Sequence, residues 1–330
     1  MKYLFYPGCA MERSARAYLD SLMAIRDTLG IELEEIEDWN CCGATEFMAV
    51  SPLPGYALIG RNLALAERQA DGSHTVMAGC SACYLNLAKA DHYMHQSPNL
   101  GETINSALAA GGLHYTPGSL KIRHLLDVLM HDVGLETIQR NVVRPLTGLR
   151  VAPYYGCMIL RPDFDHRFNY PEYPAQLDRL LGVLGAEVID FPMKLDCCGG
   201  HMTQISKPVA LELIRRLIHA AAEYRADMLV TLCPMCQLNL DAYQNEMNHY
   251  FHTHYHVAVT YFTQLIGLAF GKAPKTLGFG SEFVDARPAL ARIGMEVPAA
   301  EPPVAKPKRS RQALPMPRLP GAGDKGELSS

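Results

Sequence analysis

All ten cysteines of the chain fall into two copies of one spacing pattern. The copies are Cys9-x31-Cys41-Cys42-x37-Cys80-x2-Cys83 and Cys157-x39-Cys197-Cys198-x34-Cys233-x2-Cys236. Each copy holds a single cysteine, an adjacent pair followed by glycine, and a C-x-x-C. A repeat that uses every cysteine predicts a duplicated structural unit.

The neighbouring residues repeat as well. Residues 80–87 match 233–240, and residues 6–9 resemble 154–157. A chain of 330 residues with 48% hydrophobic content can bury two cores. We therefore expect an N-terminal unit at 1–147, a second unit at 148–275, and an extension at 276–330.

Strands and helices are predicted to alternate in both halves, which is typical of an α/β fold with parallel sheets. The predicted strands are 2–6, 31–36, 75–78, 151–155, 187–191 and 228–232, and the predicted helices are 14–29, 56–69, 122–133, 175–184 and 211–223. The polar segment 92–121 is interpreted as an excursion from the sheet. The motif cysteines follow strands, and the carboxyl ends of parallel strands are where such folds bind ligands.

Charge and hydropathy exclude several classes of protein. A formal net charge of −4 gives no electropositive field for nucleic acid. The apolar start before Cys9 is too short for an export signal, and the apolar segment 257–271 falls short of the roughly 20 residues that span a bilayer. We expect a soluble protein without a membrane span, located in the reducing cytoplasm, where clustered thiols more often bind metal than form disulfides.

The number of cysteines in each half limits the kinds of metal centre that it could bind. Five thiolates exceed the four ligands of a zinc tetrahedron, and the compact run of three cysteines usual for a cubane 4Fe–4S cluster is absent. Adjacent cysteines of an extended chain point to opposite sides, so Cys41 with Cys42, and Cys197 with Cys198, suit different irons of a larger or opened cluster. A zinc-stabilised scaffold remains the alternative.

The doubled pattern resembles the cysteine-rich CCG domain family, and the opening Met1-Lys2-Tyr3 with Cys9 resembles the B subunit of heterodisulfide reductase. The similarity covers roughly residues 1–272. It implies two Rossmann-like domains related by a pseudo-twofold axis, each binding a non-cubane 4Fe–4S cluster through five cysteines. Carried over by motif, one cluster would be held by Cys9, Cys41, Cys42, Cys80 and Cys83. The other would be held by Cys157, Cys197, Cys198, Cys233 and Cys236.

The resemblance also implies a reaction and partners. A disulfide would be reduced by homolysis between the two clusters, with electrons supplied through the flavin-containing A and iron–sulfur C subunits of heterodisulfide reductase, because this chain has no flavin or ferredoxin motif. Bacterial sulfur-oxidising complexes resemble the methanogen enzyme in this subunit, so the resemblance also allows a substrate in which sulfur is carried on a lipoate-bearing protein. The alternative within the wider family is an electron-transfer subunit of a lactate- or glycolate-type dehydrogenase.

Four features outside the cysteines carry functional hypotheses. His201 follows the second cysteine pair and could donate a proton to a leaving thiolate, or simply pack beside a cluster. Lys194 could offset cluster charge or attract an anionic substrate, or be solvated. Trp39 is expected to be buried near Cys41. The histidines of the run at 249–256 are expected to lie on the surface: His249, His252, His254 and His256.

The C-terminal stretch is rich in proline and basic residues. From Pro298 to Pro320 it contains Lys306, Lys308, Arg309, Arg311 and Arg318. Such a segment buries too little apolar surface to offset its ordering entropy, so we expect a disordered tail. This tail would either be a solvated terminus or bind a partner protein.

Overall fold

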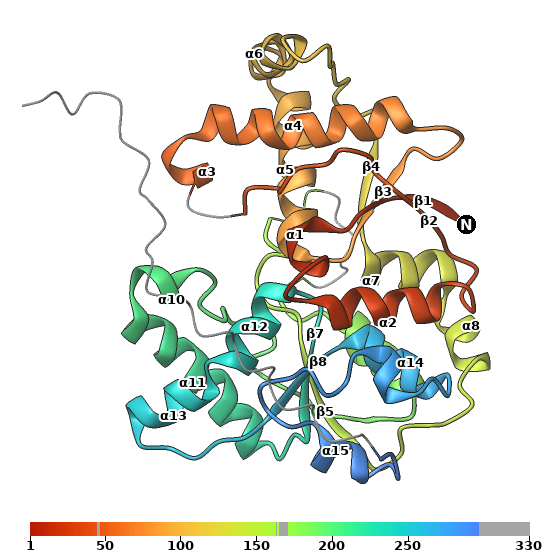
Figure 1. Cartoon of the computed structure of the whole chain (residues 1–330), viewed down its shortest axis with the longest axis vertical. Coiled ribbons are helices and arrows are strands. Elements are labelled where there is room, and N and C mark those ends of the chain that lie inside the picture. Colours follow the sequence, from red (N-terminus) through yellow and green to blue (C-terminus); the bar gives the residue numbers. More distant parts are fainter. Residues whose placement is uncertain (45–46, 163, 165–170, 297–330) are drawn as a thin grey trace, which may run out of the picture. The chain divides into compact units, whose positions relative to one another are not determined.

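The computed structural model describes residues 1–44, 47–162, 164 and 171–296. Two four-stranded parallel sheets form within these ranges, with strand orders β2-β1-β3-β4 and β6-β5-β7-β8 (Figure 1). The first sheet consists of β1 Lys2–Tyr6, β2 Glu32–Glu35, β3 Thr75–Ala78 and β4 Lys121–His124. The second consists of β5 Arg150–Tyr154, β6 Glu187–Val188, β7 Met228–Thr231 and β8 Ala258–Tyr261. The identical strand order confirms the predicted α/β class and its repeat.

Apart from the edge strands β2 and β6, the strands of both sheets are buried on both faces, as is usual for parallel sheets covered by helices. Along β1, Tyr3 and Phe5 pack into one hydrophobic cluster, while Leu4 and Tyr6 pack into another. Because side chains alternate along a strand, each sheet contributes to two layers of core.

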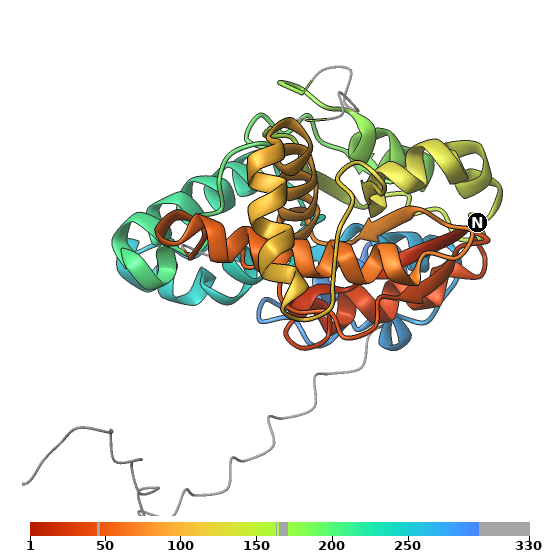
Figure 2. The ribbon, with the colours of Figure 1, turned by 90° about the horizontal axis from the view of Figure 1, so that it is seen from above.

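Helices of the first half cover its sheet, and α4, α5 and α6 gather on one side of it (Figure 2). Their bounds are α1 Gly8–Met11, α2 Arg16–Arg26, α3 Phe47–Val50, α4 Pro52–Gln69, α5 Ser81–Gln96, α6 Pro98–Ala109, α7 Leu125–Val128, the π-helix η1 Leu129–Val133, and α8 Leu135–Arg140. Helix α5 begins immediately after Cys80, so the first C-x-x-C lies at the amino end of a long helix.

The second half repeats this plan with helices of its own. They are α9 Gln176–Val183, α10 Met202–Ile205, α11 Lys207–Glu223, α12 Pro234–Ala242, α13 Gln244–Phe251 and α14 Phe262–Ala269, followed by the 3-10 helix η2 Pro274–Leu277 and α15 Arg287–Ala291. Helix α12 starts after Cys233, as α5 starts after Cys80. The repeat therefore extends to the placement of each C-x-x-C.

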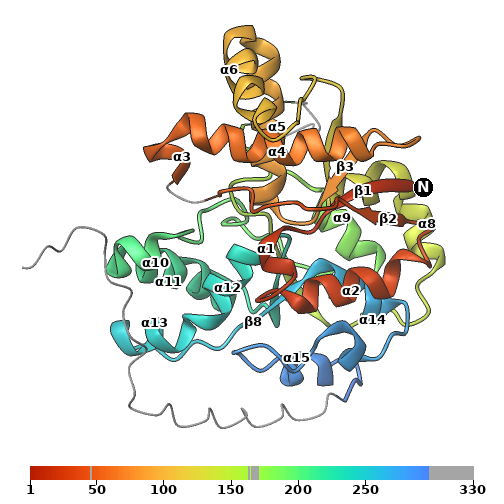
Figure 3. The same cartoon turned by 45° about the horizontal axis from the view of Figure 1, so that its top comes forward.

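The two halves share one continuous core, in which α2 packs against α14 (Figure 3). The Tyr18 ring stacks on the Tyr261 ring with centroids 4.5 Å apart. The hydroxyls of Ser21 and Thr263 form a hydrogen bond of 2.7 Å beside them. Side chains buried from both halves make this interface part of the core rather than a surface contact.

Some predicted elements were wrong. Residues 122–133 are not one helix, because Lys121–His124 forms edge strand β4, paired with β3. Segment 92–121 does leave the sheet, as predicted, but it does so as helix: it contains the end of α5 and all of α6, which packs against α4 and α5 and buries Ile104 and Leu108. Strand β8 was not predicted at all. Strand β4 is stabilised by pairing with β3, whereas β8 has the β-branched and aromatic residues typical of a strand but runs directly into helix α14.

Residues beyond η2 continue the fold to the end of the described chain. Leu277 and Leu290 are fully buried in the shared core. The predicted disordered tail from Pro298 to Pro320 lies outside the described residues. None of the helices in the described ranges combines the length and apolar character needed to cross a bilayer.

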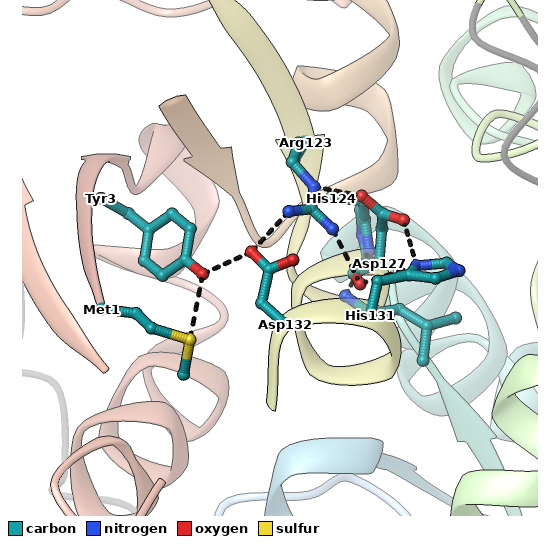
Figure 4. Close-up of polar contacts among 8 residues, drawn as sticks. Met1, Tyr3, Arg123, His124, Asp127, His131 and Asp132 are labelled. Carbon is teal, nitrogen blue, oxygen red and sulfur yellow. Dashed lines mark hydrogen bonds and ion pairs between the residues drawn. The ribbon is translucent and has the colours of Figure 1, made fainter. Parts of the chain in front are cut away.

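A buried ionic network ties β1 to β4 and η1 (Figure 4). Arg123 contacts the carboxylates of both Asp127 and Asp132, and the hydroxyl of Tyr3 donates to Asp132 at 2.6 Å. His131 lies 2.7 Å from the other oxygen of Asp127. Since Arg123 is only 5% exposed, these carboxylates compensate a charge that is removed from water.

Candidate metal centre

The cysteines of each half lie where neighbouring strands end. In the first half, Cys9 follows β1, the Cys41–Cys42 pair follows β2, and Cys80 and Cys83 open α5 after β3. The second half places its cysteines after β5, β6 and β7 in the same way. Because β2, β1 and β3 are adjacent strands of a parallel sheet, their carboxyl ends bring the three cysteine segments together.

The first set forms a chain of thiol contacts. Cys9 Sγ lies 3.5 Å from Cys41 Sγ, and Cys42 Sγ lies 3.4 Å from Cys83 Sγ. The thiols of Cys80 and Cys83 are also joined by a hydrogen bond. Cys9 and Cys41 are exposed, whereas the other three are buried.

The second set repeats these contacts position by position. Hydrogen bonds join the thiols of Cys157 and Cys197, of Cys198 and Cys236, and of Cys236 and Cys233. All ten cysteines are free thiols. The structure thus brings together each predicted set of five.

The two thiols of each adjacent cysteine pair differ in pKa. Hydrogen bonds from Cys42 and Cys9 lower the pKa of Cys41 to about 2, while the bond to Cys41 together with burial raises the pKa of Cys42 to about 12. Cys197 and Cys198 show the same shifts from the same kinds of contact. Since the thiolate is the metal-binding form, one position of each pair is poised to bind without proton loss at neutral pH.

Buried polar groups support both sets in matching ways. The hydroxyls of Tyr6 and Tyr154 each donate over 2.6 Å, to the carbonyls of Asn40 and Asp196, just before each cysteine pair. The amides of Asn86 and Asn239 donate to the carbonyls of the second cysteine of each pair, at 2.9 and 3.2 Å. Sequence reasoning assigned these four residues no role, although their identity at equivalent repeat positions was visible.

Two glycines keep space beside the sulfurs. Gly8 and Gly156 both adopt a φ of +70°. A Cβ on Gly8 would lie 2.7 Å from Cys83 Sγ, and one on Gly156 would lie 3.1 Å from Cys236 Sγ. A side chain at either position would occupy the space next to a thiol, so both glycines suit a site that must admit a bulky inorganic group.

The donor set fits iron–sulfur clusters better than a single ion. A structural zinc site takes four ligands, so five thiols in each set exceed what one zinc ion needs, whereas a cluster distributes its thiolates over several irons. The five thiols of each set, with glycine beside them, are therefore suited to a cluster.

A cavity of about 430 Å³ adjoins the second set. All five cysteines of that set line it, together with Tyr155, Met158, Gly200, His201 and Met235 from the same half. The first half contributes Ala44, Met48, Ser81, Leu85, Asn86 and Lys89. The cavity is therefore formed by both halves, and it is large enough for a small ligand.

The two predicted non-cysteine site residues lie in different environments. His201 lines the cavity together with the five cysteines of the second set. Lys194 is 1% exposed, and its Nζ lies 3.0 Å from Asp178 and 3.8 Å from the centre of the Tyr173 ring. Its carbonyl accepts from the backbone N–H groups of Tyr155 and Gly156. Lys194 therefore supports the turn that precedes Cys157.

The remaining candidates are placed as follows. Trp39 is half-buried, packs edge-on against Tyr6 at 5.4 Å, and donates its indole N–H to Glu35. The histidines 249, 252, 254 and 256 are all exposed, as predicted.

Comparisons with known proteins agree with the repeat. Residues 3–88 and 151–241 match the CCG cysteine-rich domain family. The chain is 36% identical over 285 residues to the 8-methylmenaquinol:fumarate reductase membrane anchor subunit of Wolinella succinogenes, covering 86% of this chain and 98% of that protein.

Other relatives are heterodisulfide reductase subunits. The chain is 30% identical to the B subunit of ferredoxin:CoB-CoM heterodisulfide reductase of Methanosarcina mazei, covering 87% of this chain and 92% of that protein. It is also 30% identical to a protein of Archaeoglobus profundus that is named as similar to the heterodisulfide reductase B subunit, covering 83% of this chain and 92% of that protein. A crystal structure of a hypothetical protein from Helicobacter pylori shares the fold, with a TM-score of 0.67, 13% identity, and coverage of 86% of this chain and 52% of that one.

Proposed function

Because the chain belongs to the CCG cysteine-rich domain family that includes the B subunit of heterodisulfide reductase, we propose that it is the iron–sulfur subunit of a complex that interconverts thiols and disulfides. One observation carries this proposal: a complete set of five cysteines lines a cavity that the other half closes. A substrate in that cavity would lie against the second set, while Cys80 of the first set lies directly beside Cys233.

Each set of five would hold one non-cubane 4Fe–4S cluster. The first would use Cys9, Cys41, Cys42, Cys80 and Cys83, and the second Cys157, Cys197, Cys198, Cys233 and Cys236. When bound, the clusters would supply single electrons to the site. With all ten thiols used as ligands, none would remain for the usual attack of a free thiolate on a disulfide.

The surrounding residues would control protons and geometry. Reduction of a disulfide to two thiols consumes two electrons and two protons, and His201 would donate a proton to the leaving sulfur from the cavity wall. Lys194, predicted as a second catalytic residue, would act through the turn that presents Cys157, since its ammonium is paired with Asp178. Burial of Cys198, Cys233 and Cys236 would keep water from the sulfur chemistry.

The partners would be other members of such a complex. Relatives at about one-third identity are named as subunits of multi-subunit reductases. By analogy, a flavin-containing A subunit with an iron–sulfur C subunit would deliver electrons, and the substrate would be a disulfide or lipoate-bound sulfur. The cytoplasm is the proposed location, because ten free cysteines are best preserved in a reducing compartment.

A second function is favoured by one comparison. The relative at 36% identity is a subunit of a quinol:fumarate reductase, and this chain covers 98% of its length. On this proposal the chain would relay electrons between a menaquinol and a dicarboxylate reductase. The apolar part of the cavity lining, including Met48, Leu85 and Met235, would suit a quinone ring.

The test uses the anaerobically purified chain with its co-purifying subunits. Two clusters predict about eight iron and eight labile sulfide per chain. Electrons from the reduced complex should then be transferred to a disulfide and not to fumarate. Zinc without sulfide would leave only the scaffold function, whereas oxidation of menaquinol coupled to fumarate reduction would favour the second candidate.

A further inference from the structure

One stripe of α5 forms a wall of the cavity. Ser81, Leu85 and Lys89 all line it and follow one another at intervals of four residues, so they lie on one face of the helix. Ser81 comes directly after Cys80, at the interface between the cysteine sets. A helix rises about 1.5 Å per residue, so the Cα of Lys89 lies about 12 Å along the helix from that of Ser81.

Lys89 is a half-buried cation without an ion-pair partner among the described residues. Its Nζ lies 5.8 Å from the centre of the Tyr93 ring, which is the distance of a weak cation–π contact. Lys194, by contrast, is buried against Asp178. The described residues that line the cavity include neither aspartate nor glutamate, so no carboxylate of that lining pairs with Lys89.

Apolar side chains contribute to the cavity lining from both halves: Met48 and Leu85 from the first, Met158 and Met235 from the second. Methionine side chains adapt to the shape of a flexible chain and make favourable contacts with soft sulfur atoms. Leu85 lies between Ser81 and Lys89 on the stripe of α5. Along this stripe the cavity wall therefore passes from the cysteine contact at Cys80, past an apolar side chain, to a cation.

We propose that Lys89 selects sulfur substrates that carry a free acid group at the end of an apolar chain. The acid would pair with the Lys89 ammonium, and the chain would extend along α5 so that its sulfur lies beside the second cysteine set. Sulfur and acid would be separated by on the order of 10 Å, set by the helix rise. This inference rests on the proposed thiol or disulfide function, and it assigns the specificity of the same cavity.

The experiment measures thiol binding to the anaerobic, cluster-loaded full-length chain by isothermal titration. The probes are two ω-thiols of equal length, mercaptooctanoate and mercaptooctanamide, which differ only in the charge of the end group. Wild-type protein should bind the acid about five- to tenfold more tightly than the amide. Lys89→Met should abolish this preference by weakening acid binding alone, and Lys89→Arg should restore it.

Lys121→Met is the matched control, because Lys121 is an exposed lysine on β4 that lies outside this cavity. It should keep the preference for the acid. Equal binding of acid and amide by wild-type protein, or an undiminished preference in Lys89→Met, would refute the role of Lys89 and leave the thiol function standing. If neither probe binds protein of full iron content, the thiol function itself is wrong and this inference falls with it.

Discussion

Cys80 Sγ lies 3.9 Å from Cys233 Sγ, and this contact joins the two halves of the molecule at equivalent positions of the repeat. Each is also the N-cap of a helix, α5 or α12. The two cysteine sets therefore meet at the amino ends of two equivalent helices.

Despite this contact, each set is complete within its own half. Cys41→Ser with Cys42→Ser should therefore remove about half of the iron and leave the other cluster intact, because the contacts of the second set do not involve this pair. Cys197→Ser with Cys198→Ser is the reciprocal control. Iron and sulfide analysis checks both, and full iron content in either double variant would contradict the assignment.

Replacing Gly8 tests whether the site needs the space beside the Cys83 thiol. Another glycine with a similar backbone conformation provides the control for backbone strain. Gly8→Ala should lower the iron content, since the added methyl group would lie 2.7 Å from Cys83 Sγ. Gly30 has a φ of +65° and open space where a methyl group would lie, so Gly30→Ala shares the backbone strain without the clash. Strain at such positions costs on the order of 1 kcal/mol. Equal iron loss in both variants would mean that strain, not space beside the thiol, is responsible.

Much of this site could be predicted from the sequence, because its chemistry is local. Cys41 and Cys42 are adjacent, Cys80 and Cys83 are one helical turn apart, and the preceding strands indicate where each lies. The contact of Cys80 with Cys233 could not be predicted, since it depends on how the two halves pack. Strand β4 was missed because its pairing with β3, rather than its own residue pattern, specifies it. Strand β8 was missed because its apolar residues run directly into helix α14.

The cavity lining depends on the same packing. The neighbours of Lys89 in the sequence suggest an ordinary helix surface, and its position matters only once the second half covers α5. Lys194 lies three residues before a cysteine pair in the sequence, but its buried partner Asp178 lies 16 residues earlier in the chain. Long-range pairing of this kind leaves no periodic trace in a single sequence.

Asp132 should make stability depend on pH. Burial alone would raise its pKa, but hydrogen bonds from Arg123 and Tyr3 outweigh this effect and hold the pKa below its ordinary value. A carboxylate with a depressed pKa stabilises the fold above its unfolded pKa and loses that contribution as pH falls through the folded value. Asp132→Asn should therefore lower the free energy of unfolding by about 1–2 kcal/mol near pH 7, and by progressively less below about pH 4.

Thermal unfolding measured across that pH range checks the prediction for Asp132. Asp71→Asn removes an exposed carboxylate and is the control that should show no such trend. A destabilisation of Asp132→Asn that is constant with pH would exclude the ionised carboxylate as its source.

Lys194 is predicted to act on stability more than on substrate charge. Lys194→Met should destabilise the fold by about 3 kcal/mol or more, because it leaves the carboxylate of Asp178 without its buried cation. Combining it with Asp178→Asn should recover part of that loss. Anaerobic unfolding of the single and double variants measures the coupling. Unchanged stability together with weaker binding of anionic substrates would instead assign Lys194 the electrostatic role suggested by its sequence position.

His201 is the residue most directly placed to donate a proton. It lines the cavity together with Cys197 and Cys198, the second cysteine pair. Loss of a positioned acid typically slows turnover by about a hundredfold or more, whereas glutamine keeps much of the size and hydrogen-bonding capacity of histidine. His201→Gln should therefore lower kcat for disulfide reduction to that extent, with KM and iron content nearly unchanged.

His219→Gln is the control, because His219 forms a hydrogen bond of 2.8 Å with the hydroxyl of Tyr255 and does not line the cavity. A loss of iron in His201→Gln would show that the histidine supports the cluster site rather than the proton transfer, and normal kcat with normal iron content would remove it from the mechanism.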